Sequence, residues 1–260
     1  MSPDERYFLS TFLRGILFSD DFSYLLFGSK PIAAGDVEKP TSFYFSSHCL
    51  SPSNLKIGKG FEVFKKNQHL FSSSNIIVHL SEDADYYDLV MINKKNLLKT
   101  LEQHINDFKQ VLGPEITTEY LFTQITENAG IQGLVKVINY HEALLGILLG
   151  YGRNNAWLFH QKSTMSRRMN QFEPLLKWDG TLEKKFAEEV QKMTFFSDDP
   201  HEYKYTAKSP RLPLPHFMAD PNSLETKMLK EQYGKERENM KRLFAKQNYV
   251  EATLQKLMGE

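Results

Sequence analysis

The segment from Gly150 to Asn155 has the residue types best suited to binding a ligand. It reads Gly-Tyr-Gly-Arg-Asn-Asn and joins two helical patterns. A glycine can take the left-handed conformation that ends one helix, and an asparagine can cap the next. The second helix then presents free N–H groups beside an arginine, a combination that can bind a phosphate or a carboxylate. We therefore predict ligand contacts from Arg153, Asn154 and Asn155, with a tight turn and a solvent-facing Arg153 as the alternative.

His141 and Glu142 open the apolar helical pattern that leads into this turn. A zinc-protease helix carries a second histidine four residues after the first, on the same helix face. That position is Leu145 here, so this reading fails, and the sequence predicts no metal site and no cofactor. We keep His141 and Glu142 as candidate ligand-binding residues. The alternative is a histidine in or beside the core with a hydrogen-bond partner.

Other partial motifs lack residues that their chemistry needs. His48 and Cys49 are adjacent on an expected strand, so their side chains point to opposite faces and the histidine is badly placed to activate the thiol. The acidic segment 82–88 has no central glycine of the kind a calcium-binding loop requires. Segments 28–30 and 58–60 each hold only part of a phosphate-binding loop. Without a complete catalytic motif, the sequence leaves open whether the protein is an enzyme.

Hydrophobic periodicity gives the elements that must position these residues. The apolar runs 75–80 and 87–92 predict a hairpin with an acidic loop, and 41–48 predicts a further strand. On the helix over 131–150, Leu145 and Leu148 are predicted core residues. Helical patterns of apolar residues predict helices over about 4–18, 20–27, 95–112, 117–128, 131–150, 154–172 and 182–193. Segment 53–71 is ambiguous, with Gly58 and Gly60 interrupting a short helix that extends to Phe71. The predicted fold class is α+β, with a predominantly helical body, a small antiparallel sheet and a long C-terminal helix.

Residues 195–222 carry five of the eleven prolines and cannot form a helix. Such a segment favours an extended conformation, either as an arm on the body or as a linker. Within it, Arg211–Pro215 (RLPLP) can bind an aromatic groove of a partner or pack on its own domain. The predicted organisation is therefore a mixed α+β domain over 1–194, a Pro-rich arm over 195–222, and a charged amphipathic helix over 223–260.

The C-terminal helix has apolar residues at alternating steps of four and three from Leu229 to Leu257, with charged residues outside this seam. We expect it to begin near Asp220-Pro221, since proline suits a first helical position. Gly234 weakens the seam. The helix either lies antiparallel on its own domain or projects and pairs with a second copy or a partner helix.

Charge and hydropathy exclude some classes of protein. Basic and acidic residues number 32 each, so the whole chain lacks the basic excess expected for nucleic-acid binding. The single Cys49 excludes an intrachain disulfide framework and a multi-cysteine metal site. The apolar run Ala143–Gly150 is far shorter than the about 20 residues of a membrane span, so no transmembrane segment is expected.

The first residues include Asp4 and Glu5, whereas a secretory signal peptide begins with basic residues. We therefore expect a cytoplasmic location, with the envelope or the exterior as the alternative if a leader has been removed.

Two segments, LLFGSKPI (Leu25–Ile32) and HEALLGILLGYGRNNAWLFHQ (His141–Gln161), resemble those of an uncharacterised protein family of chlamydia-like intracellular bacteria. They cover about a ninth of the chain. The resemblance implies a bacterial protein of a host-associated lineage, with an N-terminal hydrophobic leader in some members. It brings no activity, cofactor or catalytic residue.

These observations favour a non-enzymatic protein, with an interaction or structural role in a host-associated bacterium. Its partner would be another protein or a second copy, bound through the C-terminal helix. The alternative is a small-molecule protein or enzyme for an anionic ligand, with its pocket near 150–155. Titratable residues converging on a cavity would favour the alternative.

Overall fold

The structure is a computed structural model that describes residues 1–19, 21–39, 52–82, 85–172, 193–196 and 212–259. The predicted strand 41–48 with His48 and Cys49, and all but the last residue of the predicted helix 182–193, lie outside the described residues. The same is true of Arg211 in the RLPLP motif.

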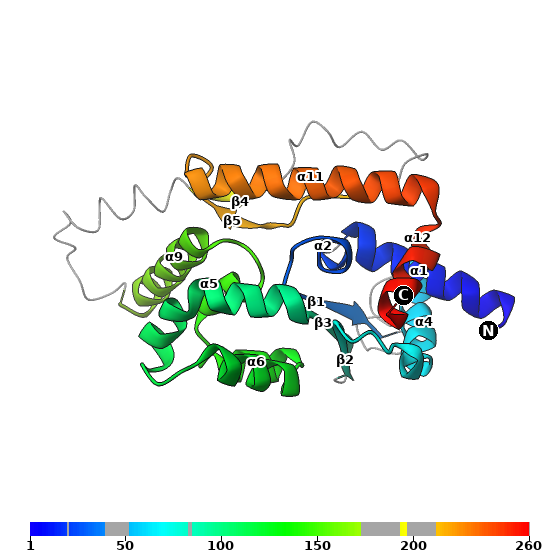
Figure 1. Cartoon of the computed structure of the whole chain (residues 1–260), viewed down its shortest axis with the longest axis horizontal. Coiled ribbons are helices and arrows are strands. Elements are labelled where there is room, and N and C mark those ends of the chain that lie inside the picture. Colours follow the sequence, from blue (N-terminus) through cyan, green and yellow to red (C-terminus); the bar gives the residue numbers. More distant parts are fainter. Residues whose placement is uncertain (20, 40–51, 83–84, 173–192, 197–211, 260) are drawn as a thin grey trace.

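A three-stranded antiparallel sheet lies at the centre of the molecule (Figure 1). Its strands are β1 (Ile32–Glu38), β2 (Ile76–Glu82) and β3 (Tyr86–Asn93), in the order β1-β3-β2. The predicted hairpin is confirmed as β2 and β3. Strand β1 was not predicted, because Ala33, Ala34 and Gly35 interrupt its β-branched pattern. In the register, Ile92 lies between Ile32 and Ile77.

The central strand β3 sends alternate side chains into two different cores. Leu89 and Met91 belong to one apolar cluster, whereas Val90 and Ile92 belong to another. Successive residues of a strand point to opposite faces, so both faces of the sheet are buried under helices. This explains why the strand is a continuous apolar run rather than an alternating one.

The first face is covered by three helices from the N-terminal quarter of the chain and by the last helix of the chain. Aromatic rings fill this core, with Phe12 in contact with both Phe61 and Phe64. The covering helices are α1 (Pro3–Ser19), α2 (Phe22–Phe27), α4 (Pro52–Lys66) and α12 (Tyr249–Met258), and a short 3-10 turn, η1 (Gln68–Leu70), follows α4.

The second face is covered by consecutive helices, namely α5 (Lys94–Leu112), α6 (Thr118–Glu127), α7 (Ile131–Val137), α8 (Glu142–Leu148) and α9 (Arg153–Phe172). The single helix expected over 131–150 is wrong, since α7 and α8 are separate. Asn139 and Tyr140 break it, with φ angles of 52° and 57°. Asparagine tolerates this left-handed region well, and the Tyr140 N–H turns back to Val135 O. Leu148 is fully buried in this core, while Leu145 is half-buried against it.

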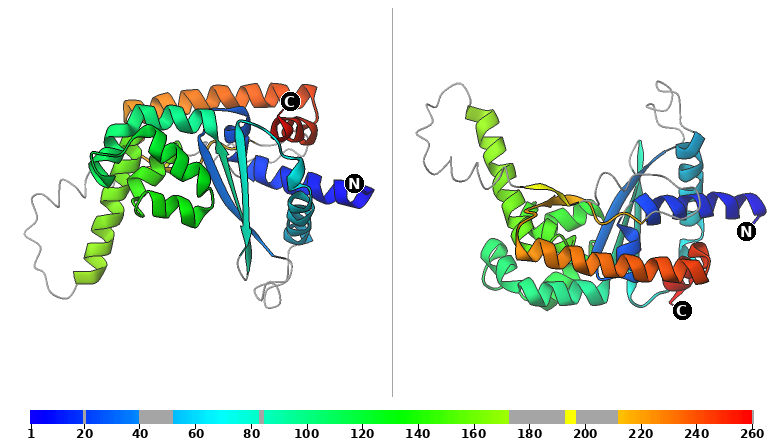
Figure 2. Two further views of the ribbon diagram at one scale, coloured as in Figure 1. Left: turned by 60° about the horizontal axis from the view of Figure 1, so that its bottom comes forward. Right: turned by 90° about the horizontal axis from the view of Figure 1, so that it is seen from above.

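Helix α11 (Leu224–Lys246) lies across both groups of helices (Figures 1 and 2). It begins later than expected, because Ser223 provides the cap while Asp220 bonds to Asn222 N in a preceding turn. The predicted single helix also ends early. Gln247 is extended, and Asn248 caps the separate helix α12 through Val250 N.

The C-terminal part of the Pro-rich segment packs on the body. Leu212 and Leu214 are buried in a third cluster with Tyr24 and Tyr233. Strand β5 (Phe217–Ala219) pairs antiparallel with β4 (Thr194–Phe196) beneath α11.

The fold class predicted from the sequence, mostly helical α+β with a small antiparallel sheet, is confirmed. Within the described residues, no helix combines the length and apolar character needed to cross a bilayer.

Candidate functional site

The turn at 150–155 has the predicted backbone. Gly150 and Gly152 are left-handed, with φ angles of 76° and 88°, and α9 begins at Arg153. The N–H groups at the helix start already hold a carboxylate from the same chain. Glu225 Oε2 of α11 accepts hydrogen bonds from Asn154 N at 2.9 Å and from Asn155 N at 3.2 Å.

Arg153 is also paired within the chain. Its Nε donates to both carboxylate oxygens of Asp107 on α5, at 2.9 and 2.8 Å. Trp157 Nε1 donates to the same carboxylate at 2.9 Å. Asp107 is buried, and its hydrogen bond raises the pKa of Arg153. The anion-binding chemistry of this turn is thus engaged by two internal carboxylates.

Asn155 joins the turn to the segment that precedes α11. Its Nδ2 donates to Tyr151 O, and its Oδ1 accepts from Asp220 N and Thr226 Oγ1. Because the side chain is buried and these contacts are internal, it acts as a connector. Asn154, by contrast, is exposed beside it.

His141 lies in a stack of rings between α8 and α9. Its ring centroid is 4.1 Å from that of His160 and 5.3 Å from that of Trp157. Burial lowers the pKa of His141, and the neighbouring His160 adds to this effect. His141 Nδ1 is buried and has no hydrogen-bond partner among the described residues, so the fold favours an uncharged ring here.

Glu142 points toward α9 rather than toward the 150–155 turn. Its Oε1 accepts from Ser163 Oγ at 2.9 Å and pairs with Arg167 Nη2 at 2.8 Å. Glu142 and Asn155 both line a cavity of 210 Å³, to which Tyr151 and Phe217 also contribute. The structure therefore brings two of the five predicted residues to one small cavity and separates Arg153 from it.

A buried lysine from the segment 28–30 is the centre of another contact. Lys30 is fully buried, with Nζ 2.8 Å from Asp21 Oδ2 and bonded to Leu149 O. The same ammonium lies 4.4 Å from the centroid of the Tyr151 ring. Burial lowers the pKa of Lys30, and Asp21 opposes the shift. This contact joins segment 25–32 to segment 141–161.

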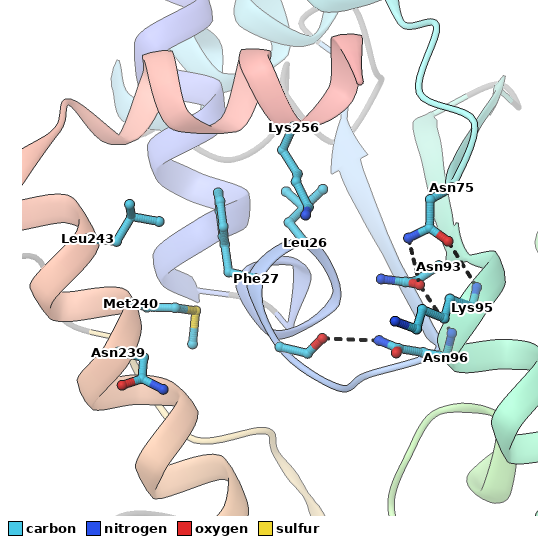
Figure 3. Close-up of a pocket in the computed structure, with 11 residues that line it drawn as sticks. Leu26, Phe27, Asn75, Asn93, Lys95, Asn96, Asn239, Met240, Leu243 and Lys256 are labelled. Atoms are coloured by element: carbon cyan, nitrogen blue, oxygen red, sulfur yellow. Dashed lines mark hydrogen bonds between the residues drawn. The ribbon is translucent and has the colours of Figure 1, made fainter. Parts of the chain in front are cut away.

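A cavity of 330 Å³ lies among α2, the start of α5 and the two C-terminal helices (Figure 3). We call it the asparagine–lysine pocket. Its polar wall consists of Asn75, Asn93, Lys95, Asn96, Asn239 and Lys256, and its apolar wall of Leu26, Phe27, Met240 and Leu243. Its side chains come from segments far apart in the sequence.

Three asparagines of this wall hold one another in place. Asn93 Oδ1 accepts from Asn96 N at 3.1 Å and from Asn75 Nδ2 at 3.0 Å, while Asn93 Nδ2 donates to Leu25 O. Asn96 Nδ2 donates to Gly28 O. Each side-chain amide has two N–H donors, so Asn75 and Asn93 each keep one without a partner among the described residues.

The described residues that line the pocket include two cations and no carboxylate. Ion pairs of described lysines involve Lys30, Lys39, Lys65, Lys66, Lys235 and Lys241. Lys95 and Lys256 therefore form no ion pair with a described residue. Glu236 of α11 is not a lining residue, but its carboxylate lies beside Gly28, which is one, and accepts from Ser29 N. An anion entering this cavity would meet two ammonium groups that are not paired with a described acid, together with spare amide N–H groups.

A larger groove of 650 Å³ lies between α1 and α12. Its wall is mainly apolar and includes Leu9, Val250, Leu254 and Met258. Nothing in the described part of the chain identifies an occupant for it.

Sequence reasoning missed the asparagine–lysine pocket because its signal is spread over five segments. The one local clue was the pattern at Asn93, a cap residue directly before a strong helix. Among the described residues, no group of three or more acidic, histidine or cysteine side chains is arranged to hold a metal ion. No protein-family model, curated protein or solved structure matches this chain.

Proposed function

We propose that this protein binds a small organic anion with an apolar portion in the asparagine–lysine pocket. The observation that carries the proposal is that Lys95 and Lys256 line one cavity, and that none of its described lining residues is an acid. Two ammonium groups that form no ion pair with a described residue give the cavity a positive potential, and charge-assisted hydrogen bonds to a carboxylate or phosphate are among the strong ones.

The apolar wall of the pocket indicates that such an anion would also have an apolar portion. Phe27, Met240 and Leu243 offer apolar surface opposite the polar side. The cavity volume lies at the lower end of the about 300–1,000 Å³ that ligand sites occupy. A short-chain carboxylate or an organic phosphate of similar size fits both walls, whereas a large or polycationic ligand does not.

The interaction role predicted from the sequence, and the bacterial lineage implied by the resemblance, stay predictions. The position of α11 supports the binding proposal. The helix lies on the body of its own chain, whereas an interaction through a projecting helix would need it to extend away. Tyr233 and Met240 of this helix are buried there, so its apolar seam is already used.

The test compares hexanoate with hexanol by titration calorimetry on the full chain. The two probes share an apolar chain and differ in charge, so we expect hexanoate to bind more tightly. The Lys95→Gln/Lys256→Gln variant should lose about 1.5–3 kcal/mol of binding free energy for each charged contact that is removed. Each lost contact then raises the Kd about ten- to a hundredfold. Lys99→Gln, an exposed change on α5 outside the pocket, is the matched control.

Two results would overturn the proposal. One is equal affinity for hexanoate and hexanol, which would show that the lysines contribute no recognition. The other is an unchanged Kd in the double variant, which would place the binding elsewhere. Inorganic phosphate, tested in parallel, distinguishes a preference for carboxylates from one for phosphates.

A further inference from the structure

We infer that a ligand in the asparagine–lysine pocket holds helices α11 and α12 against the body of the protein. This inference rests on the proposed function and concerns its regulation. The pocket is shared between two parts of the chain, since Asn239, Met240, Leu243 and Lys256 belong to the C-terminal helices. Its other wall comes from α2 and from the region around the start of α5.

Helix α11 is fastened to the body over its first half. Glu225 caps the start of α9, and Tyr233 Oη donates to Gly150 O at 2.7 Å. One turn later, Glu236 Oε2 accepts from Ser29 N at 3.2 Å. These contacts tie the helix to the 150–155 turn and to the end of α2.

The other end of the C-terminal region is fastened at a separate place. Phe244 packs against Phe18 and Phe27 with its ring edge-on to each. In α12, Leu257 O accepts from Ser73 N at 3.0 Å, and Leu257 itself is fully buried in the first core.

Between these two sets of contacts lies the pocket. Asn239 is exposed, and its side chain makes no hydrogen bond to a described residue. Met240 and Leu243 face the cavity, with Lys95 and Asn96 on the opposite side (Figure 3). A bound anion would contact both walls between these two sets of contacts, beside the buried Met240.

Thermodynamic linkage gives the consequence. A ligand that contacts both walls binds the docked arrangement and not the opened one, so it suppresses opening by a factor of up to 1 + [L]/Kd. At a ligand concentration of about 100 Kd, this is about a hundredfold. Amides that exchange by opening of the C-terminal helices should slow by up to that factor.

Hydrogen exchange of the full chain, with and without hexanoate, tests the inference. We expect slower exchange in peptides from residues 224–258 and around 75–96, with little change in α6 (118–127), which is distant from the pocket. Lys95→Gln/Lys256→Gln should abolish this protection, and Lys99→Gln should retain it.

The outcomes separate the inference from the proposed function. If hexanoate binds by calorimetry and protects only residues around 75–96, or slows exchange uniformly along the chain, the inference is wrong and the binding function stands. If hexanoate fails to bind at all, the proposed function and the inference fall together. Protection confined to the pocket walls and the C-terminal helices supports both.

Discussion

The guanidinium Nε of Arg153 lies 2.9 and 2.8 Å from the two carboxylate oxygens of Asp107. Because this pair and the Glu225 cap already engage the turn, Arg153→Ala should leave any stabilisation by added anions unchanged in a thermal-shift screen. It should still lower the free energy of unfolding by about 1–3 kcal/mol, since it leaves a buried carboxylate with fewer partners.

The matched control for that change is Arg153→Ala combined with Asp107→Asn. Removing the charge together with its partner should cost less than the sum of the single changes. A loss of anion stabilisation in Arg153→Ala, with Lys95→Gln/Lys256→Gln unaffected, would instead place the ligand at the turn.

Leu148 tests the second core. Its side chain is fully buried among helices α5 to α9, so Leu148→Ala should lower the free energy of unfolding by about 2–5 kcal/mol in chemical denaturation. Leu98→Ala, at a position on α5 that is 38% exposed, is the control and should cost much less. A loss below about half a kcal/mol in the free energy of unfolding would contradict the burial of Leu148 in this core.

Tyr87 gives a prediction at high pH. Burial, and then its hydrogen bond to Glu62, raise the pKa of Tyr87 to about 12. In the unfolded chain a tyrosine titrates near pH 10, so the stabilisation is complete below about pH 10 and is lost as pH rises toward 12. A tyrosinate absorbance titration of the wild type minus that of Tyr87→Phe should show this late ionisation. A difference curve centred near pH 10 would contradict it.

His141 gives the opposite prediction at low pH. Since burial lowers the pKa of His141, the unfolded chain binds its proton more readily than the folded one. Stability should therefore fall as pH drops through about 6.5, and His141→Gln should reduce that fall. Denaturant melts at about pH 8 serve as the reference, because the imidazole is neutral there in both states. If the free energy of unfolding falls with pH equally in wild type and variant, His141 does not contribute to the pH dependence.

Removing the residues after Pro221 tests the packing of the C-terminal helices. Tyr24, Phe18 and Phe27 would lose the rings and methionine of α11 that cover them. The melting temperature should fall and aggregation should increase, because an apolar face becomes exposed. An unchanged melting temperature would show that these helices contribute no stability to the body.

The sequence predicted the elements with strong local patterns. The hairpin of β2 and β3 and the helix ending at Gly113 follow from apolar periodicity and from turn and cap residues. The break between α7 and α8 was missed because Asn139 and Tyr140 interrupt a pattern that is otherwise helical. A left-handed tyrosine has no signature in sequence, since it depends on what the turn must connect.

The candidate site was less accessible to sequence reasoning. Arg153, Asn154 and Asn155 had the right chemistry for an anion. The structure supplies two internal carboxylates instead: Asp107, which is 46 positions from Arg153, and Glu225, which is 71 positions from Asn154. Such partners are set by tertiary packing, which a local pattern does not encode. Lys30 shows the same limit, because nothing near it in the sequence indicates that its ammonium is fully buried.

Strand β3 limits which sequences this fold accepts. In most half-exposed strands every second position faces water and can vary freely, whereas Leu89, Val90, Met91 and Ile92 all meet apolar neighbours. Its edge neighbour β1 is different, since Ala34 and Asp36 are exposed and can tolerate polar replacements. Divergent relatives of this protein should therefore be recognisable by an unbroken apolar stretch at β3 followed by a helix-capping residue, while their β1 strands differ.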